Sequence, residues 1–198
     1  MPKLASRQGT SIFVWCAAII CALISVAVIF GGIAVFVGYL VIHPRIPIIS
    51  VVNAHLDLLR YDISRVMETQ ITIIVRAEND NEKAHATFED TEFHLSFGGK
   101  YIAILKAAPF KVGKNSSLDF SYVVQSYPVP LGPTEMQMID YALKQDVITF
   151  DLKGDSRTRW RVGPFGSVRF WCDLNCELNF RPSDHSYLRS PCSSSHKH

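Results

Sequence analysis

Residues 168–180 read VRFWCDLNCELNF, and this stretch decides the fold class that we predict for the chain. Every second side chain from Val168 to Phe180 is apolar, whereas the side chains between them are polar apart from Trp171. Strict alternation over this length indicates a β-strand with one face in a core and the other toward solvent. The predicted buried face consists of Val168, Phe170, Cys172, Leu174, Cys176, Leu178 and Phe180.

The same alternation occurs at three earlier places, separated by glycine-, asparagine- or aspartate-containing turn segments. Several short strands of this kind predict an antiparallel β-sandwich or barrel. One short helix is expected between them, because Thr134 can cap an apolar run at helical spacing from Met136 to Leu143. We expect this helix to lie across one open end of the sandwich. The alternating positions are Ile71, Ile73 and Val75; Thr91, Phe93, Leu95 and Phe97; and Leu118, Phe120, Tyr122 and Val124.

The segment 11–42 contains no charged residue, and its apolar run extends from Ile12 to Ile42. A helix needs only about 20 apolar residues to cross a bilayer core. A secretory signal has a shorter apolar core of about 7–15 residues. Two prolines, Pro44 and Pro47, follow and end the helix. The sequence therefore predicts a transmembrane helix with limits Ile12 and Ile42 rather than a cleaved signal.

The chain is 48% hydrophobic and 19% charged, and its formal net charge of +2 comes from Lys3 and Arg7. The remainder is neutral, which argues against a nucleic-acid-binding domain, because such a domain needs a basic excess. Positive-inside counting favours a cytoplasmic N-terminus and an external C-terminal domain. The predicted parts are a cytoplasmic basic tail at 1–10, the transmembrane helix at 11–42, a proline-containing linker at 43–50, a β-sandwich at 51–181 and a disordered tail at 182–198.

Small residues within the predicted helix fall at spacings of four, three and four and therefore share one face. Such a face lets a second helix approach closely, so self-association is one interpretation. The other is that glycine and alanine are simply common in membrane helices. Cys16 and Cys21 are likewise either palmitate acceptors or plain small residues. The four residues of the shared face are Ala27, Gly31, Ala34 and Gly38.

Five features occur in this order along the chain: the basic tail, the long helix, the exit His43-Pro44-Arg45-Ile46-Pro47, the segment Asn79-Asp80-Asn81 and the strand containing Cys172. Together they resemble a known family of plant membrane proteins, those related to the non-race-specific disease resistance and harpin-induced proteins. The globular part of that family is the late embryogenesis abundant group 2 domain. Asp80 stands where the family usually has the proline of an Asn-Pro-Asn turn, and a type I turn accepts aspartate there.

The resemblance implies a seven-stranded sandwich of fibronectin-like or immunoglobulin-like shape that is anchored in the plasma membrane and faces the cell wall. It also implies a role in pathogen defence and abiotic stress, without catalytic activity. We therefore expect a non-enzymatic binding or adhesion module with a protein, lipid or cell-wall partner. The alternative is a lipid-binding protein of membrane contact or lipid transfer, which requires an apolar groove deeper than side chains would fill.

Three cysteines lie beyond the membrane segment, and an odd number in an oxidising compartment leaves at least one unpaired. Cys172 and Cys176 share a strand face, but four residues of strand separate their Cα atoms by about 13 Å. A disulfide tolerates less than about 7 Å. We expect both to be buried small apolar residues. Cys192 can pair with either of them or with another chain.

No residue pattern predicts catalysis, a cofactor or a metal site. Asp184-His185-Ser186 contains three triad residue types, but a triad converges from separate elements of a fold. The spacing of Cys172 and Cys176 is not C-x2-C, and no histidine pair stands near them. We expect His196-Lys197-His198 to be a solvated end of the chain.

Arg157, Arg159 and Arg161 occupy alternate positions, so in a strand their guanidinium groups would form a row about 13 Å long. Such a row can contact lipid headgroups, wall polyanions or an acidic partner. The alternative is a solvated strand face that also blocks edge-to-edge pairing.

Asn115-Ser116-Ser117 is the chain's only glycosylation sequon, and it falls in a predicted turn. We expect a glycan at Asn115 if the domain is lumenal or external, because a cytoplasmic domain is not glycosylated in this way. A glycosylphosphatidylinositol anchor is not predicted, because the C-terminus lacks a hydrophobic tail.

Overall fold

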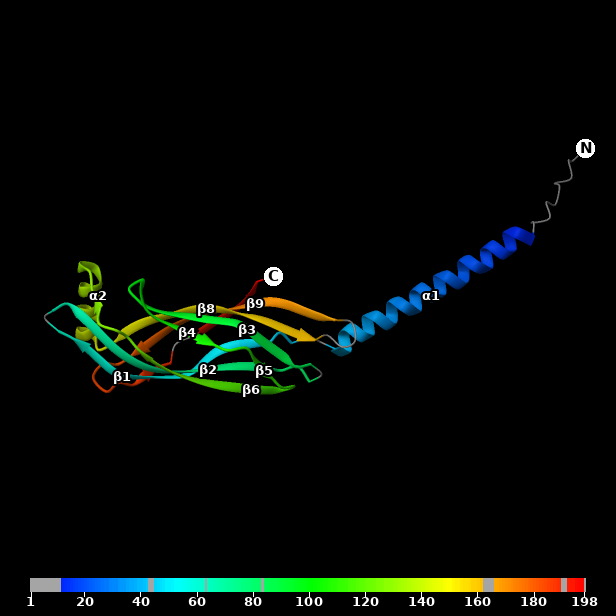
Figure 1. Ribbon diagram of the computed structural model, residues 1–198. Coiled ribbons are helices and arrows are strands. Elements are labelled where there is room, and N and C mark those ends of the chain that lie inside the picture. The colour runs from blue at the N-terminus through cyan, green and yellow to red at the C-terminus, as the bar shows by residue number, and fades with distance from the viewer. Residues whose placement is uncertain are drawn as a thin grey trace, which may run out of the picture. The chain divides into compact units, whose positions relative to one another are not determined.

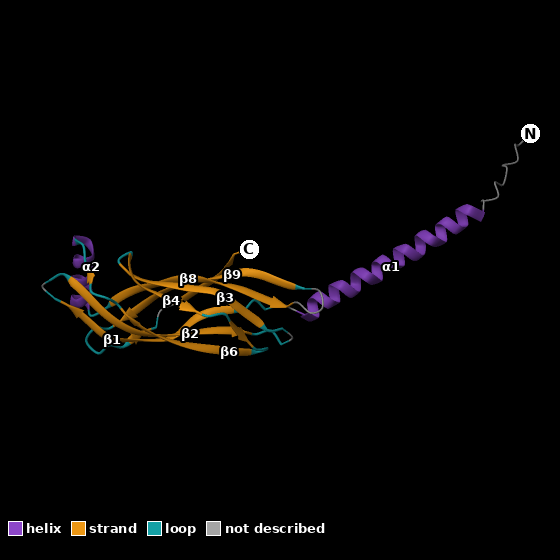
Figure 2. Ribbon diagram, viewed as in Figure 1, coloured by secondary structure: helices purple, strands orange, loops and turns teal. Residues whose placement is uncertain are grey.

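The computed structural model describes residues 12–42, 45–62, 64–82, 84–161, 166–189 and 192–197. The chain divides into two compact units, Met1–His43 and Pro44–His198. The described residues of the first form a single helix, and those of the second form mainly strands (Figure 2). The predicted basic tail with Lys3 and Arg7 lies outside the described residues, as do His43 and Pro44 of the predicted linker.

Helix α1 spans Ile12–Ile42, so both predicted limits coincide with its ends. Its 31 residues give a length of about 46 Å at 1.5 Å per residue, against about 30 Å for the hydrocarbon core of a bilayer. The part Ile12–Gly38 is apolar enough to cross a membrane, and none of its most apolar window is buried. The helix is therefore long and apolar enough for a single membrane span.

The second unit is an antiparallel β-sandwich, as the alternating pattern predicts. One sheet has the strand order β1-β2-β6, with β7 also paired to β2. The other has the order β10-β9-β8-β3-β4, with β11 paired to β9 and β5 paired to β3. Figure 1 shows the two sheets as two layers. The strands are β1 (Ile48–Tyr61), β2 (Val66–Asn79), β3 (Ala86–Phe97), β4 (Lys100–Ala107), β5 (Phe110–Val112), β6 (Ser116–Gln125), β7 (Val129–Pro130), β8 (Ile148–Arg161), β9 (Ser167–Phe180), β10 (Tyr187–Leu188) and β11 (Cys192–Lys197).

The described residues contain eleven strands, where the family resemblance implies seven. Three edge positions are each filled by two successive strands: β4 and β5 along β3, β6 and β7 along β2, and β10 and β11 along β9. The last of these edges belongs to the segment 182–198, which the sequence predicts to be disordered. That prediction is wrong, because β10 and β11 both pair with β9 and complete its sheet.

Burial follows the predicted alternation along the long strands. Ile71, Ile73 and Val75 of β2 are at most 2% exposed, and the inward positions of β9 are buried from Phe170 to Phe180. The pattern fails at Val168 and Leu118, which are 42% and 39% exposed. Both lie within the first three residues of their strands. Alternation therefore identified the core face correctly except at strand ends.

Aromatic rings join the two sheets across the core. The ring of Phe110 in β5 lies 5.0 Å from that of Phe88 in β3 and 4.3 Å from that of Phe120 in β6. Because β3 and β6 belong to different sheets, Phe110 bridges them. A second ring group surrounds Phe150, whose centroid lies 5.6 Å from Phe97 and 6.0 Å from Phe180.

Helix α2 spans Pro133–Gln145, and Gly132 rather than the predicted Thr134 is its N-cap. Pro133 takes the first helical position, where its missing N–H is not needed, so the helix begins earlier than predicted. A Cβ atom on Gly98, in the turn between β3 and β4, would lie 3.1 Å from Met138 Sδ, so α2 approaches this turn closely. As predicted, α2 lies across one end of the sandwich (Figure 1).

Candidate functional site

A buried asparagine pair joins three segments at the end of the sandwich where β1 begins. Nδ2 of Asn79, the fully buried last residue of β2, donates to the carbonyl oxygens of Ala84 (2.9 Å) and Gly113 (2.7 Å). Nδ2 of Asn81 donates to Asn79 Oδ1 (2.9 Å), and Asn81 Oδ1 accepts from the backbone N–H of Arg45 (3.0 Å). One network thus ties the β2–β3 connection, the β5–β6 connection and the segment that leads into β1.

The chain reverses after β2 through these side chains. The backbone N–H of Asn81 donates to Asn79 Oδ1 (3.3 Å), which is the local pattern by which asparagine favours turns. Asp80 between them is exposed, and its carboxylate lies 3.9 Å from the Arg45 guanidinium. The side chain at the position where the resembled family has proline is therefore exposed to solvent. The side chains of Asn79 and Asn81 stabilise the turn.

We expect Asn79→Ala to lower the free energy of unfolding by about 2 kcal/mol, because two half-buried carbonyls and the buried Asn81 amide lose their partner. Urea unfolding of the full chain in mild detergent, followed by circular dichroism, measures the loss. Asn175→Ala is the matched control, since Asn175 is exposed on β9. Equal losses in the two variants would contradict a special role for the buried network.

Asn115 lies exposed in the connection between β5 and β6. Its φ of 43° is in the left-handed region, which asparagine tolerates better than most residues. Its backbone N–H donates to the carbonyl of Asn81 (3.0 Å), so the connection is held by the asparagine network. Ser116 and Ser117 are exposed as well, and the whole sequon is accessible.

The three predicted arginines occupy alternate positions of β8, and two of them are paired with acids. Arg157 lies 3.7 Å from Asp90, and Arg159 Nη2 donates to Glu89 Oε1 (2.6 Å). Strand β8 is paired with β3 on one side and with β9 on the other. The row is therefore not on an edge, and its interpretation as protection against edge pairing is wrong.

A groove of about 770 Å³ opens beside Arg159 and Arg161. Two further cations line it, Lys111 from β5 and Lys114 from the β5–β6 connection. We call the cleft defined by these four cations the basic groove. The sequence does not identify Lys111 and Lys114 as part of such a group, because only the pairing of β5 and β8 with β3 brings them beside the arginines.

Two other clefts of about 500 and 260 Å³ lie near the β1–β2 connection. Glu68 and Pro128 line both, and the larger also contains Gln125, Ser126 and Tyr127. All three clefts have polar or charged side chains in their walls. The lipid-carrying alternative calls instead for an apolar groove.

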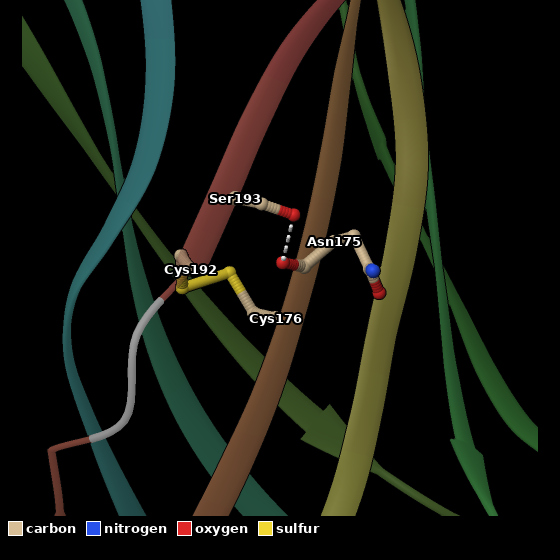
Figure 3. The surroundings of a disulfide bond; sticks show 4 residues. All are labelled: Asn175, Cys176, Cys192 and Ser193. Atoms are coloured by element: carbon tan, nitrogen blue, oxygen red, sulfur yellow. Dashed lines mark hydrogen bonds between the residues drawn. A yellow bond between two sulfur atoms is a disulfide. The ribbon is translucent and has the colours of Figure 1, made fainter.

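Cys176 of β9 and Cys192 of β11 form a disulfide, and they are direct partners in the strand register with Cα atoms 4.3 Å apart (Figure 3). Beside it, Ser193 Oγ donates to the backbone carbonyl of Asn175 (3.3 Å). Pairing of Cys192 with Cys176 was one of the alternatives left open by the sequence. Cys176 is buried, as expected, but the expectation that it is a small apolar residue without a disulfide partner is wrong.

Cys172 is free and fully buried, in agreement with the sequence prediction. Its Sγ lies 3.9 Å from the carbonyl oxygen of Pro47 and 3.6 Å from Ser194 Oγ. Burial raises the pKa of this thiol, which keeps it protonated and unreactive. Strand β11 and the segment leading into β1 both contact it.

Asp184, His185 and Ser186 form a local turn. Ser186 donates to Asp184 Oδ1 from both Oγ (2.6 Å) and its backbone N–H (3.0 Å), and Arg181 donates to Oδ2 (3.3 Å). The bonds from Ser186, with a smaller effect of Arg181, lower the pKa of the Asp184 carboxyl to about 2. The acid thus bonds to the serine directly, whereas a triad places histidine between them.

The described part of the chain holds no group of three His, Cys, Asp or Glu side chains placed to bind a metal ion. His196 and Lys197, predicted as a solvated end, belong to β11, and His198 lies outside the described residues. In α1, Cys16 and Cys21 are exposed, and open space surrounds Gly31 and Gly38. Self-association through Ala27, Gly31, Ala34 and Gly38 stays a prediction.

No protein-family model matches the sequence, and a comparison with curated proteins returns no match. Among solved structures, the chain is similar to a crystal structure of a protein from Archaeoglobus fulgidus, with 10% identity and a TM-score of 0.32. The similarity covers 67% of this chain and 97% of that chain. A TM-score this low supports no argument about fold or function.

Proposed function

We propose that the protein is anchored by α1 and that its sandwich acts as a non-enzymatic binding or adhesion module in an oxidising compartment outside the cytoplasm. The disulfide between Cys176 and Cys192 carries the proposal. Disulfides persist in extracytoplasmic compartments and are rare in the reducing cytosol. A cytoplasmic N-terminus, which positive-inside counting favours, would place the sandwich on the same oxidising side.

The sequence resemblance supports a more specific version of this proposal. It favours the plant plasma membrane, with the sandwich in the cell wall space, and a role in pathogen defence and abiotic stress. The alternative, lipid binding in membrane contact or lipid transfer, stays a prediction. The three clefts described above do not favour it, because polar and charged side chains line each of them.

Glycosylation of Asn115 tests the proposed topology. Expressed in plant cells, the chain is expected to migrate more slowly than Asn115→Gln on a denaturing gel, and glycosidase treatment should remove the difference. The exposed sequon makes the site available to the lumenal glycosylation machinery. Ser117→Ala destroys the sequon without changing Asn115 and should match Asn115→Gln.

Ser116→Ala is the matched control, because it changes the neighbouring exposed serine and keeps an intact sequon. It should migrate like the parent chain. Equal mobility of all four proteins, together with digestion of the sandwich by protease added from the cytosolic side, would refute the external topology.

A further inference from the structure

We propose that the basic groove binds the phosphate groups of anionic lipid headgroups, those without a compensating headgroup cation, in the bilayer that holds α1. The inference rests on the proposed anchoring of the protein, but it does not depend on which face of the membrane carries the sandwich. Three properties carry it: the alignment of cations across strands, the lack of a carboxylate partner for Lys111, Lys114 and Arg161 within the described residues, and the short chain between the groove and α1.

Cations from three strands meet in one row across the outer face of a sheet. Lys111 of β5 is paired with Thr87 of β3, which is paired on its other side with Arg159 of β8. Arg159 is in turn paired with the exposed Arg169 of β9. Directly opposite residues lie on the same face of a sheet, so the row crosses three strand spacings, about 14 Å.

This row carries more positive charge than the Glu89 carboxylate offsets. Like charges directly opposite each other in a sheet are destabilising, and Arg159 and Arg169 occupy such positions. Glu89 compensates Arg159 alone. Arg159 lines the groove, so a phosphate group bound there would add a second anion beside this row. The guanidinium fork matches phosphate oxygens in a bidentate manner.

No carboxylate among the described residues neutralises the other three cations of the groove. Within the described residues, Lys111, Lys114 and Arg161 have no ion pair, and each of the three is exposed. The groove is open rather than enclosed, so it can meet a surface of headgroups. It therefore combines a net positive charge with access from outside.

The chain that connects α1 to this end of the sandwich is short. Arg45 follows Ile42, the last residue of α1, by three positions, which allows at most about 11 Å of extended chain. Arg45 is bonded to Asn81, and Asn79 in the same network holds the carbonyl of Ala84 in the wall of the groove. A short tether gives headgroups a high effective concentration, which a soluble polyanion lacks.

The test uses the full chain in lipid nanodiscs, either of phosphatidylcholine alone or of an equal mixture with phosphatidylglycerol. We expect amide exchange in Phe110–Val112 and in the following Lys114 connection to slow about tenfold in the anionic discs. High salt should remove the effect, because the attraction is electrostatic. The variant Lys111→Gln, Lys114→Gln, Arg161→Gln should exchange equally fast in both discs.

The matched control replaces three exposed cations outside the groove, Arg60→Gln, Lys144→Gln and Lys153→Gln, and should keep the parent's response. Equal slowing of amide exchange by anionic discs in the parent chain and in the triple variant would overturn the inference. Protection in neutral discs on addition of polygalacturonate or millimolar inorganic phosphate, but none in anionic discs, would assign the groove to a soluble anion instead. A chain that fails to co-elute with discs would refute the anchoring and with it the proposed function.

Discussion

Gly154→Ala is expected to lower the free energy of unfolding by about 3 kcal/mol or more, so that little folded protein is recovered. A Cβ atom on Gly154 would lie 2.1 Å from the carbonyl oxygen of Glu92 and 2.6 Å from the Cα of Phe93. Both are backbone atoms of β3, which cannot rotate away as a side chain can. The register between β3 and β8 shifts between Glu89 and Glu92, next to this close approach.

Gly113→Ala is the matched control, because a Cβ there would meet Ser116 at 3.6 Å, an ordinary contact. Its stability should stay within about 1 kcal/mol of the parent chain. Urea unfolding of both full-length variants in mild detergent makes the comparison. A Gly154→Ala chain with the parent's unfolding midpoint would show that β3 and β8 do not pair in this register.

Removing the disulfide is expected to cost about 3 kcal/mol, since it closes a loop between residues 16 positions apart. The variant is Cys176→Ala with Cys192→Ala. Its β11 should exchange backbone amides faster, because β11 pairs only with β9 among the described strands. Cys172 should then react with maleimide in the folded protein, since Ser194 of β11 contacts its thiol.

Cys172→Ala is the control for this prediction, because it removes a buried free thiol and leaves the disulfide in place. Its loss of stability should be smaller than that of the double variant. A reducing agent should destabilise the parent and Cys172→Ala but leave the double variant unchanged. A parent chain whose unfolding is insensitive to reduction would argue against the disulfide.

The fold class was predictable because one face of each long strand is buried and the other is not. Alternation in 168–180 and around Ile73 is a local consequence of that burial, and it can be read without knowing which strands pair. The 31-residue helix was predictable for a similar reason, since an uncharged apolar run of that length has few other stable forms. The exposure of apolar residues at strand ends, such as Val168, was not predictable, because alternation does not show where other segments stop covering a strand.

The edge formed by β10 and β11 could not be predicted in this way. The sequence Cys192-Ser-Ser-Ser-His-Lys has little apolar character and no alternation. It becomes a strand through backbone pairing with β9 and through the disulfide, and both depend on residues about 16 or more positions away. The early start of α2 at Pro133 was missed for a simpler reason, because glycine at position 132 also serves as an N-cap.

The amino-acid sequence by itself determined that this protein has one helix able to span a membrane, followed by an antiparallel sandwich. The helix follows from the length of the uncharged apolar run, and the sandwich follows from the alternation of apolar and polar side chains. Both are patterns of residues that are near one another in the sequence. Only the tertiary structure decided that Cys192 pairs with Cys176, that β8 lies inside a sheet, and that Lys111 and Arg161 share one groove. Those outcomes depend on strand order and register, which arise from contacts between segments far apart in the chain.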